Sequence, residues 1–188
     1  DPNVRFQVAS ALYKIDPSTK RAVVPVLLES FKVNDIGLRT QIASKLYEIQ
    51  PSLLDDGIIS QVIPALQSSE EGVTEVAVDL LVRIGGDAVT FIVSLLQEIG
   101  FTADTQVTIS SIQILSRIGQ EAGSAVPILI ELVQHSDWLV RAEAIEAIGG
   151  IGNATVDVIS MLVNLLQDPN GSVRGNAALA LGPLSYTH

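Results

Sequence analysis

Side chains that commonly carry catalysis or metal binding are sparse in this 188-residue chain. Its only histidines are His135 and His188, and it contains no cysteine. Zinc and other transition metals draw most of their protein ligands from histidine, cysteine and carboxylate groups. A histidine-rich or thiolate metal centre is therefore excluded. The absence of cysteine also excludes disulfide bonds and leaves the redox state of the compartment open.

Two pairs of adjacent carboxylates, Asp55-Asp56 and Glu70-Glu71, have the residue type needed for acid–base catalysis. Both pairs lie where helices are expected to start, and there acidic residues stabilise the helix dipole. The glycine-rich segments 84–87 and 149–152 do not follow a predicted strand, as a phosphate-binding loop would. We therefore expect no catalytic site, no cofactor and no metal, and predict that the protein is not an enzyme.

The hydrophobic pattern of the chain repeats six times at steps near 34 residues, which is typical of a solenoid. The copies open at Val4, Leu38, Val73, Val107, Val140 and Val173. In the fifth copy, apolar residues spaced three and four apart from Val140 to Ile151 predict one helix. The glycines at 149, 150 and 152 end this helix, and a second helix is expected near 154–167.

This pattern predicts an all-α fold in which each repeat is a pair of antiparallel helices. We expect an α-solenoid, a right-handed superhelix of about 5.5 such units. Residues 1–188 would form a single solenoid. Because the chain begins at Asp1-Pro2 in the middle of a repeat, we also expect it to be a fragment of a larger array or of a multidomain protein.

Three segments resemble HEAT repeats, most of all the short bacterial and archaeal kind found in phycobilisome-lyase-type proteins. They are Asp-Pro-Asn-Val-Arg at 1–5, Trp-Leu-Val-Arg-Ala-Glu-Ala-Ile-Glu-Ala-Ile-Gly at 138–149, and the Asp-Pro and Val-Arg pattern within 168–182. In this family, an arginine after the opening residue and a nearby aspartate commonly form a ladder between units. The resemblance therefore implies a structural role for Arg5, Arg39, Arg141, Arg174, Asp35 and Asp137. Thr74 and Thr108 replace the arginine in copies three and four.

The charge of the chain is unevenly distributed around a net value of −10. Residues 1–45 hold seven Lys/Arg and four Asp/Glu, whereas residues 46–188 hold four and seventeen. This acidity argues against a nucleic-acid backbone or an anionic membrane surface as the partner. We expect a protein or peptide partner of basic or amphipathic character, a cytoplasmic location, and self-association through uncapped ends.

The family resemblance implies that the second helix of each repeat lines the concave face. Positions on one side of these helices combine an apolar row with an acidic row. The candidate partner-binding residues are Val26, Glu29, Phe91, Leu95, Glu98, Ile128, Glu131 and Met161. The alternative for the apolar members is that they pack neighbouring helices together. Trp138, the only tryptophan, follows a helix start and is either a contact anchor or a cover for the adjacent turn.

The leading interpretation is a protein–protein interaction scaffold without catalysis, which binds through the face of the second helices. Two alternatives stay open. The family resemblance allows a subunit similar to a chromophore (bilin) lyase, for which Arg83 and Arg117 are the spare arginines. A HEAT-like nucleic-acid-binding protein is the other alternative, although only the first 45 residues have the required sign of charge.

Overall fold

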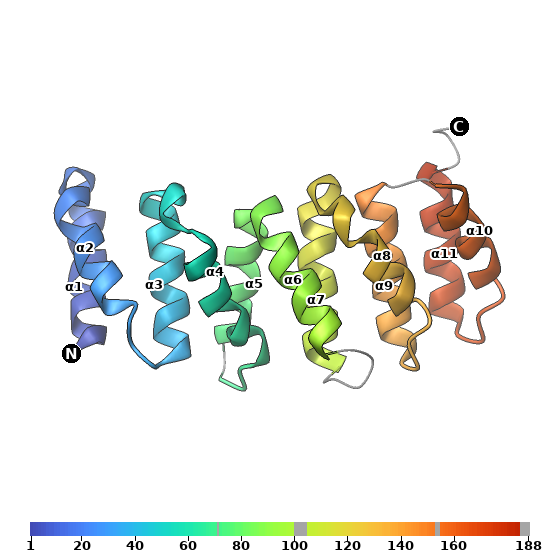
Figure 1. The fold of residues 1–188 in the computed structure, drawn as a ribbon, viewed down its shortest axis with the longest axis horizontal. Coiled ribbons are helices and arrows are strands. Elements are labelled where there is room, and N and C mark those ends of the chain that lie inside the picture. Colours follow the sequence, from blue (N-terminus) through green and yellow to red (C-terminus); the bar gives the residue numbers. More distant parts are fainter. Residues whose placement is uncertain (71, 100–104, 153–154, 185–188) are drawn as a thin grey trace. The chain divides into compact units, whose positions relative to one another are not determined.

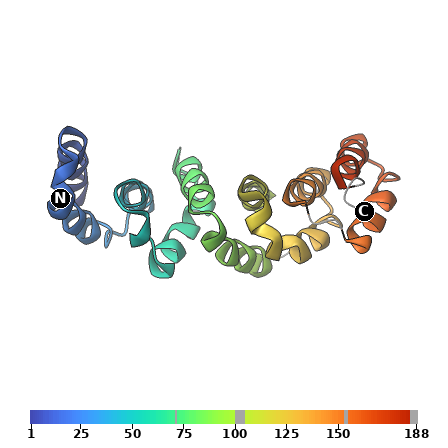
Figure 2. The same cartoon turned by 90° about the horizontal axis from the view of Figure 1, so that it is seen from above.

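A computed structural model of the chain describes residues 1–70, 72–99, 105–152 and 155–184, with side chains through residue 182. All regular structure in these segments is helical (Figures 1 and 2). The chain divides into two compact units, unit 1 at Asp1–Leu81 and unit 2 at Val82–His188. The prediction of an all-α solenoid is confirmed.

Unit 1 contains two helical hairpins and most of a further helix. The first hairpin pairs α1 (Pro2–Ile15) with α2 (Lys20–Ser30), and α3 (Ile36–Ile49) packs on both of them. The partner of α3 is a short helix, α4 (Asp56–Val62), which continues as the 3₁₀ helix η3 (Ile63–Gln67). The helix α5 (Val73–Ile84) extends across the boundary into unit 2.

In unit 2, the second helix of repeat three is α6 (Gly86–Ile99), which packs on α7 (Thr105–Ile118). The 3₁₀ helix η5 (Gly119–Ala125) leads into α8 (Val126–Leu132). The next hairpin is α9 (Trp138–Ile151) and α10 (Val156–Leu165), and the last described helix is α11 (Gly171–Leu184). In this unit α9 packs between α7 and α11, so that the first helices of successive repeats are direct neighbours.

The second helices of repeats two and four are less regular than the sequence pattern predicts. The pattern predicts one second helix per repeat, but in repeat two α4 is followed by η3, and in repeat four the 3₁₀ helix η5 precedes α8. Pro64 lies near the start of η3, where its missing N–H removes an α-helical hydrogen bond. In repeat four the backbone of Ala122 leaves helical geometry inside η5, and Pro127 starts α8.

First helices end in two different ways. After α1 and α3, an extended residue is followed by proline, at Asp16-Pro17 and Gln50-Pro51, which open the 3₁₀ helices η1 (Pro17–Thr19) and η2 (Pro51–Leu53). After α5, α7 and α9 the chain turns through a left-handed glycine instead, with φ of 73°, 71° and 78° at residues 85, 119 and 152. Glycine adopts this backbone geometry without a side-chain clash.

The core is aliphatic and follows the repeat. Residues four and eight positions after each opening residue are fully buried in the interior repeats; examples are Ile42, Leu46, Ala144 and Ile148, all 0% exposed. Burial of apolar surface of this kind is the dominant favourable contribution to folding. Within each unit, the interior repeats thus hide their apolar faces, as a solenoid requires.

Candidate interaction surfaces and the network joining repeats

Aspartates cap the N-termini of several first helices. The carboxylate of Asp1 accepts a hydrogen bond from the N–H of Asn3, and Asp35 accepts one from Leu38, each at 2.8 Å. Asp137 accepts one from the N–H of Leu139, also at 2.8 Å. These bonds satisfy backbone donors that have no partner inside the helix.

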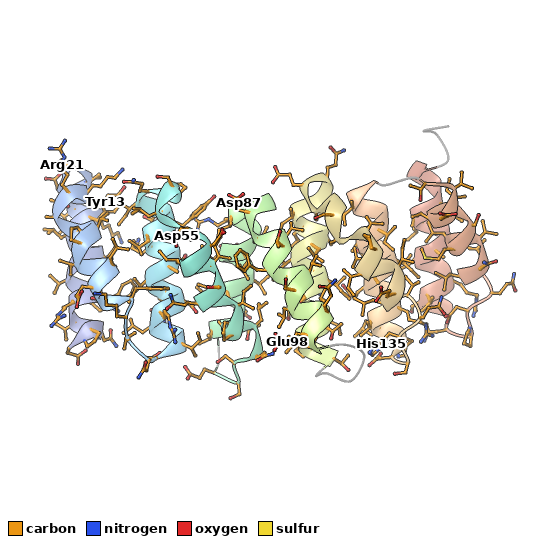
Figure 3. All side chains as sticks on the ribbon, in the orientation of Figure 1. Tyr13, Arg21, Asp55, Asp87, Glu98 and His135 are labelled. Atoms are coloured by element: carbon orange, nitrogen blue, oxygen red, sulfur yellow. The ribbon has the colours of Figure 1, made fainter. Side chains whose placement is uncertain are left out.

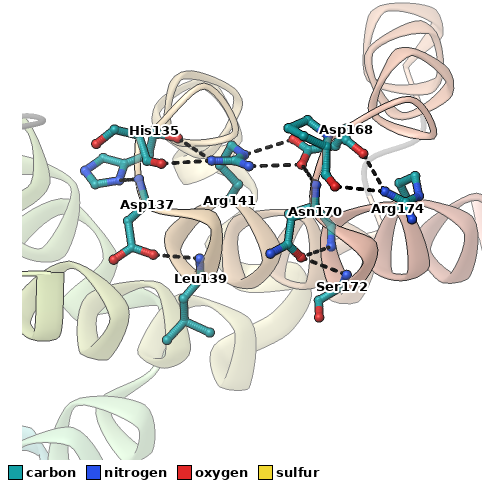
Figure 4. A network of polar contacts seen from close by, with 11 residues as sticks. His135, Asp137, Leu139, Arg141, Asp168, Asn170, Ser172 and Arg174 are labelled. Atoms are coloured by element: carbon teal, nitrogen blue, oxygen red, sulfur yellow. Dashed lines mark hydrogen bonds and ion pairs between the residues drawn. The ribbon is translucent and has the colours of Figure 1, made fainter.

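Arg141 connects α9 to the loop that enters the next repeat (Figure 4). Its Nε and Nη2 donate to the two carboxylate oxygens of Asp168, at 3.0 and 2.9 Å. Both side chains are largely buried, with 12% of Arg141 and 7% of Asp168 exposed. The hydrogen bond from Arg141 lowers the pKa of Asp168, so that the carboxylate stays ionised. Bidentate, charge-assisted pairs of this kind are among the stronger polar contacts in proteins.

The same arginine also fixes the loop that precedes its own helix. Its Nη1 donates to the carbonyl oxygens of His135 and Ser136, at 2.9 and 3.1 Å (Figure 4). One repeat later, Nη1 of Arg174 donates to the carbonyls of Asp168 and Pro169, at 2.8 and 3.1 Å. In both repeats the acceptors lie six and five residues before the arginine. Arg141 therefore holds the loops on both sides of its repeat.

Repeat three retains one of these bonds with a different side chain. Oγ1 of Thr74, which occupies the arginine position, donates to the carbonyl of Ser68, six residues earlier, at 3.3 Å. It also lies 3.3 Å from the carbonyl of Ala65. The hydroxyl thus supplies a donor to the backbone group that receives an arginine in repeats five and six.

Among the described residues of unit 1, no carboxylate pairs with Arg39 as Asp168 pairs with Arg141 in unit 2. Nη1 of Arg39 lies 3.5 Å from Oε1 of Gln61, and its Nε is buried without a hydrogen-bond partner among the described residues. Arg5 is exposed. A hydrogen bond from Lys32 lowers the pKa of Glu29, and the charge of Arg5 makes a smaller contribution in the same direction.

The aspartates that were expected to pair with the ladder arginines have a different role in the structure. Asp35 and Asp137 cap helices, and the carboxylate that binds Arg141 belongs to Asp168 instead. The reason is geometric, because Asp168 lies in the loop after α10, 27 residues from Arg141, and the hairpin brings the two together. An aspartate five residues before the opening residue Val173 is the sequence signal that identifies it.

The predicted partner-binding residues differ in how much of their surface is accessible. In unit 1, Val26 and Glu29 are both exposed on α2. In unit 2, Leu95 and Ile128 are buried at 7% and 8% exposure, and Phe91 and Met161 are half-buried. The low exposure of Leu95 and Ile128 favours the alternative for the apolar row, in which these side chains pack neighbouring helices together.

The acidic residues of this face are accessible. Glu98, labelled in Figure 3, lies in the last turn of α6 and is exposed. Glu131, on α8, is also exposed, and α6 and α8 contact each other. Trp138, the first residue of α9, is 44% exposed. We define the second-helix face of unit 2 as Phe91, Glu98, Glu131 and Met161. It contains two exposed carboxylates and two half-buried apolar side chains.

A shallow apolar groove lies on α1 and α2 in unit 1. Its volume is about 250 Å³, and it is lined mostly by valine, leucine and alanine, with Arg5 at its edge. Val4, Val8 and Leu12 are 58%, 61% and 43% exposed. The corresponding residues of repeat two, Leu38, Ile42 and Leu46, are 8%, 0% and 0% exposed. We call Val4, Val8 and Leu12 the α1 face.

Within the described segments, no group of three or more histidine, cysteine and carboxylate side chains is placed to hold a metal ion. No helix in the same segments is long and apolar enough to cross a bilayer.

Part of the chain matches a known protein family. Residues 92–182 match the family of HEAT repeats. No curated protein matches the chain. The match is to HEAT repeats in general, and the resemblance to the phycobilisome-lyase type stays a prediction.

Three solved structures with similar folds are engineered or designed proteins. An engineered protein from a structural genomics consortium is 22% identical, with a TM-score of 0.56 over 99% of this chain and 92% of that one. A designed armadillo repeat protein, solved in complex with the peptide (KR)4, is 19% identical, with a TM-score of 0.58 over 97% and 91%. A second engineered protein is 21% identical, with a TM-score of 0.53 over 98% and 53%. Together, the stacked helical hairpins and the family match show that this chain is a helical repeat protein, with HEAT repeats matched over residues 92–182.

Proposed function

We propose that this helical repeat protein is a non-catalytic scaffold that binds a basic or amphipathic peptide segment of a partner protein. The observation that carries the proposal is the second-helix face of unit 2, where the exposed carboxylates of Glu98 and Glu131 lie on two helices in contact. Half-buried Phe91, on α6, and Met161, on α10, supply apolar surface on second helices of the same unit. Complementary charge at such a surface speeds association and selects against acidic partners.

Two further observations support this kind of partner. Unit 2 carries ten Asp/Glu and four Lys/Arg, a net charge of −6. The designed armadillo repeat protein with a similar fold was solved with a peptide of alternating lysine and arginine. A cytoplasmic location is part of the same proposal, and cell fractionation of the source organism tests it.

Fluorescence anisotropy with a labelled (KR)4 peptide tests the proposal directly. The double variant Glu98→Gln/Glu131→Gln should raise the Kd about 3- to 10-fold at low salt, because each exposed ion pair contributes roughly 0.2–1 kcal/mol. Binding should weaken as salt is added, since exposed charges are screened. Glu75→Gln, which removes one negative charge at an exposed position on α5, is the control and should leave the Kd nearly unchanged. Equal affinity of the wild type and the double variant would contradict the proposal.

A second candidate function, self-association, is favoured by the α1 face. In repeat two the residues that correspond to Val4, Val8 and Leu12 are covered by a preceding helical hairpin. We propose that a two-helix repeat of a second copy covers the α1 face in the same way. Burial of about 25 cal/mol per Å² of apolar surface favours this association.

Sedimentation velocity over a range of protein concentrations tests self-association. The wild type should form larger species as concentration rises, and Val8→Lys should remain monomeric because it places a charge in the apolar surface. Gln7→Lys adds the same charge at an exposed neighbouring position on α1 and serves as the control. A wild-type protein that stays monomeric throughout would remove this function and leave peptide binding unaffected.

A further inference from the structure

A second concave surface lies on the first helices of unit 2, apart from the second-helix face. It is a groove of about 430 Å³ that crosses α7, α9 and α11. Its apolar and small residues are Gly149, Gly150, Leu179 and Ala180. We call it the first-helix groove.

One of its two glycines has a packing explanation. A Cβ atom added to Gly149 would lie 3.1 Å from the Cβ of Ala180 and 3.3 Å from its Cα. These distances are tighter than ordinary contacts, and the second involves backbone. Gly149 therefore allows the close approach of α9 and α11, which pack directly on each other.

Gly150 has no such explanation. An added Cβ would meet nothing closer than Oγ of Ser116, at 3.7 Å, which is an ordinary contact distance. Its φ is not positive, unlike those of the glycines that end first helices. Glycine inside a helix costs about 0.5–1 kcal/mol relative to alanine. Gly175 on α11 also lacks a packing explanation, but it does not line the groove, whereas Gly150 does. The missing side chain of Gly150 keeps the floor of the groove open.

The side chains around this floor share one chemical property. The carboxylate of Glu146, the hydroxyl of Ser116 and the side-chain oxygen of Asn176 can all accept hydrogen bonds. Nδ2 of Asn176 already donates to the carbonyl of Ala142 at 3.0 Å, which orients this amide. None of the residues that line the groove is cationic. Leu179, 74% exposed, adds an apolar wall.

We infer that the first-helix groove binds a lysine or arginine side chain of an extended peptide. Such a side chain combines an aliphatic stem with a cationic head. The stem fits against Leu179 and Ala180 over the Gly150 floor, and the head is placed to meet Glu146 and the neutral acceptors. The negative charge of Glu146 and of unit 2 as a whole complements this occupant. The site is separate from the second-helix face, and either can exist without the other.

The test measures binding of labelled (KR)4 to the Glu98→Gln/Glu131→Gln protein, in which the second-helix face has lost its charges. In this background, Gly150→Leu should raise the Kd at least 10-fold by filling the groove, while its melting temperature stays equal or rises. Gly175→Leu is the matched control, because Gly175 is an exposed helical glycine of α11 with no atom within 4 Å of an added Cβ. It should leave the Kd unchanged.

Two charge tests complete the design. Glu146→Gln should raise the Kd about 3-fold at low salt, as expected for an exposed ion pair. A peptide with norleucine for lysine and citrulline for arginine keeps the stems, removes the charges, and should bind at least 10-fold more weakly. Unchanged binding by Gly150→Leu, or equal binding of the charged and neutral peptides, would overturn the inference. Loss of binding in the Glu98/Glu131 background, together with an unchanged Kd for Gly150→Leu made alone in the wild type, would overturn the inference and support the second-helix face alone.

Discussion

Arg141 and Asp168 form a bidentate ion pair, with N–O distances of 2.9 and 3.0 Å, between a first helix and the loop that enters the next repeat. Asp168 also accepts a hydrogen bond from the N–H of Asn170 at 2.8 Å. One carboxylate thus holds the arginine of one repeat and shapes the start of the next. The stability of unit 2 should depend strongly on this pair.

Replacement of Asp168 by asparagine should destabilise unit 2 by about 2–3 kcal/mol. The substitution leaves the largely buried guanidinium of Arg141 without its counter-charge, and unpaired buried charges are costly. Urea denaturation followed by circular dichroism measures the effect. Asp157→Asn, at an exposed site on α10, should change the stability by less than about 0.5 kcal/mol. Similar losses for both variants would show that the pair contributes little.

The contribution of this pair should also disappear in acid. Because Arg141 lowers the pKa of Asp168 in the folded state, the unfolded chain takes up this proton more readily. The stabilisation is then fully present above the unfolded carboxyl pKa of about 3.9 and is lost as pH falls through the lower, folded pKa. The stability difference between wild type and Asp168→Asn should stay constant above about pH 5 and shrink below about pH 4. A difference independent of pH would contradict this assignment.

Substitution of Ser68 by aspartate can give Arg39 the carboxylate partner that it lacks among the described residues of unit 1. Ser68 occupies the same place before Val73 that Asp168 occupies before Val173, and its Oγ accepts from the N–H of Glu70 at 3.1 Å. Ser68→Asp should give Arg39 a bidentate partner, satisfy its buried Nε, and stabilise unit 1 by about 1 kcal/mol.

The melting temperature of the variant measures this gain. Ser69→Asp, which adds the same charge at the next, exposed residue, should give no increase. A gain that both variants share would point to general electrostatics, and no gain from Ser68→Asp would show that Arg39 cannot reach the new carboxylate.

A buried hydroxyl in α7 offers a further test. Oγ of Ser111 is fully buried and has no hydrogen-bond partner among the described residues. The corresponding position is alanine in repeats three, five and six, at Ala77, Ala144 and Ala177. Ser111→Ala should therefore stabilise the protein by about 0.5–1 kcal/mol, because it removes an unsatisfied polar group and favours the helix.

Chemical denaturation of Ser111→Ala alongside Ser110→Ala checks this expectation. Oγ of Ser110 lies 3.5 Å from Nε2 of Gln106, so removal of this hydroxyl should gain less stability or lose some. A loss of stability in Ser111→Ala would mean that its hydroxyl has a partner in solution.

The sequence predicts the register of the repeats well, because the residues at equivalent positions of the interior repeats are buried. Val140, Ala144, Ile148 and Ile151 were expected to form one apolar side of a helix, and all four are buried on α9. The pattern works because every first helix repeats the same spacing against the same kind of neighbour. The end of α9 at Gly152 follows equally from the sequence, since a left-handed residue favours glycine.

The candidate sites are harder to derive, because they depend on which helices become neighbours. Leu95 and Ile128 have the right spacing for an exposed row, yet packing buries both. Asp168 is 27 residues from Arg141, so only the folded hairpin reveals the pair. The first-helix groove likewise depends on side chains from three different helices. Helical periodicity defines the side of a helix on which a residue lies, but it does not define what covers that side.

The bond between Thr74 and the carbonyl of Ser68 has a consequence for how such repeats diverge. Its acceptor is a main-chain atom, which is present whatever residue occupies position 68. Mutation can therefore exchange arginine for threonine at the donor position, or vary the loop sequence, without loss of the acceptor. Individual repeats can in this way accumulate differences in charge and acquire separate ligand preferences while their shared frame persists.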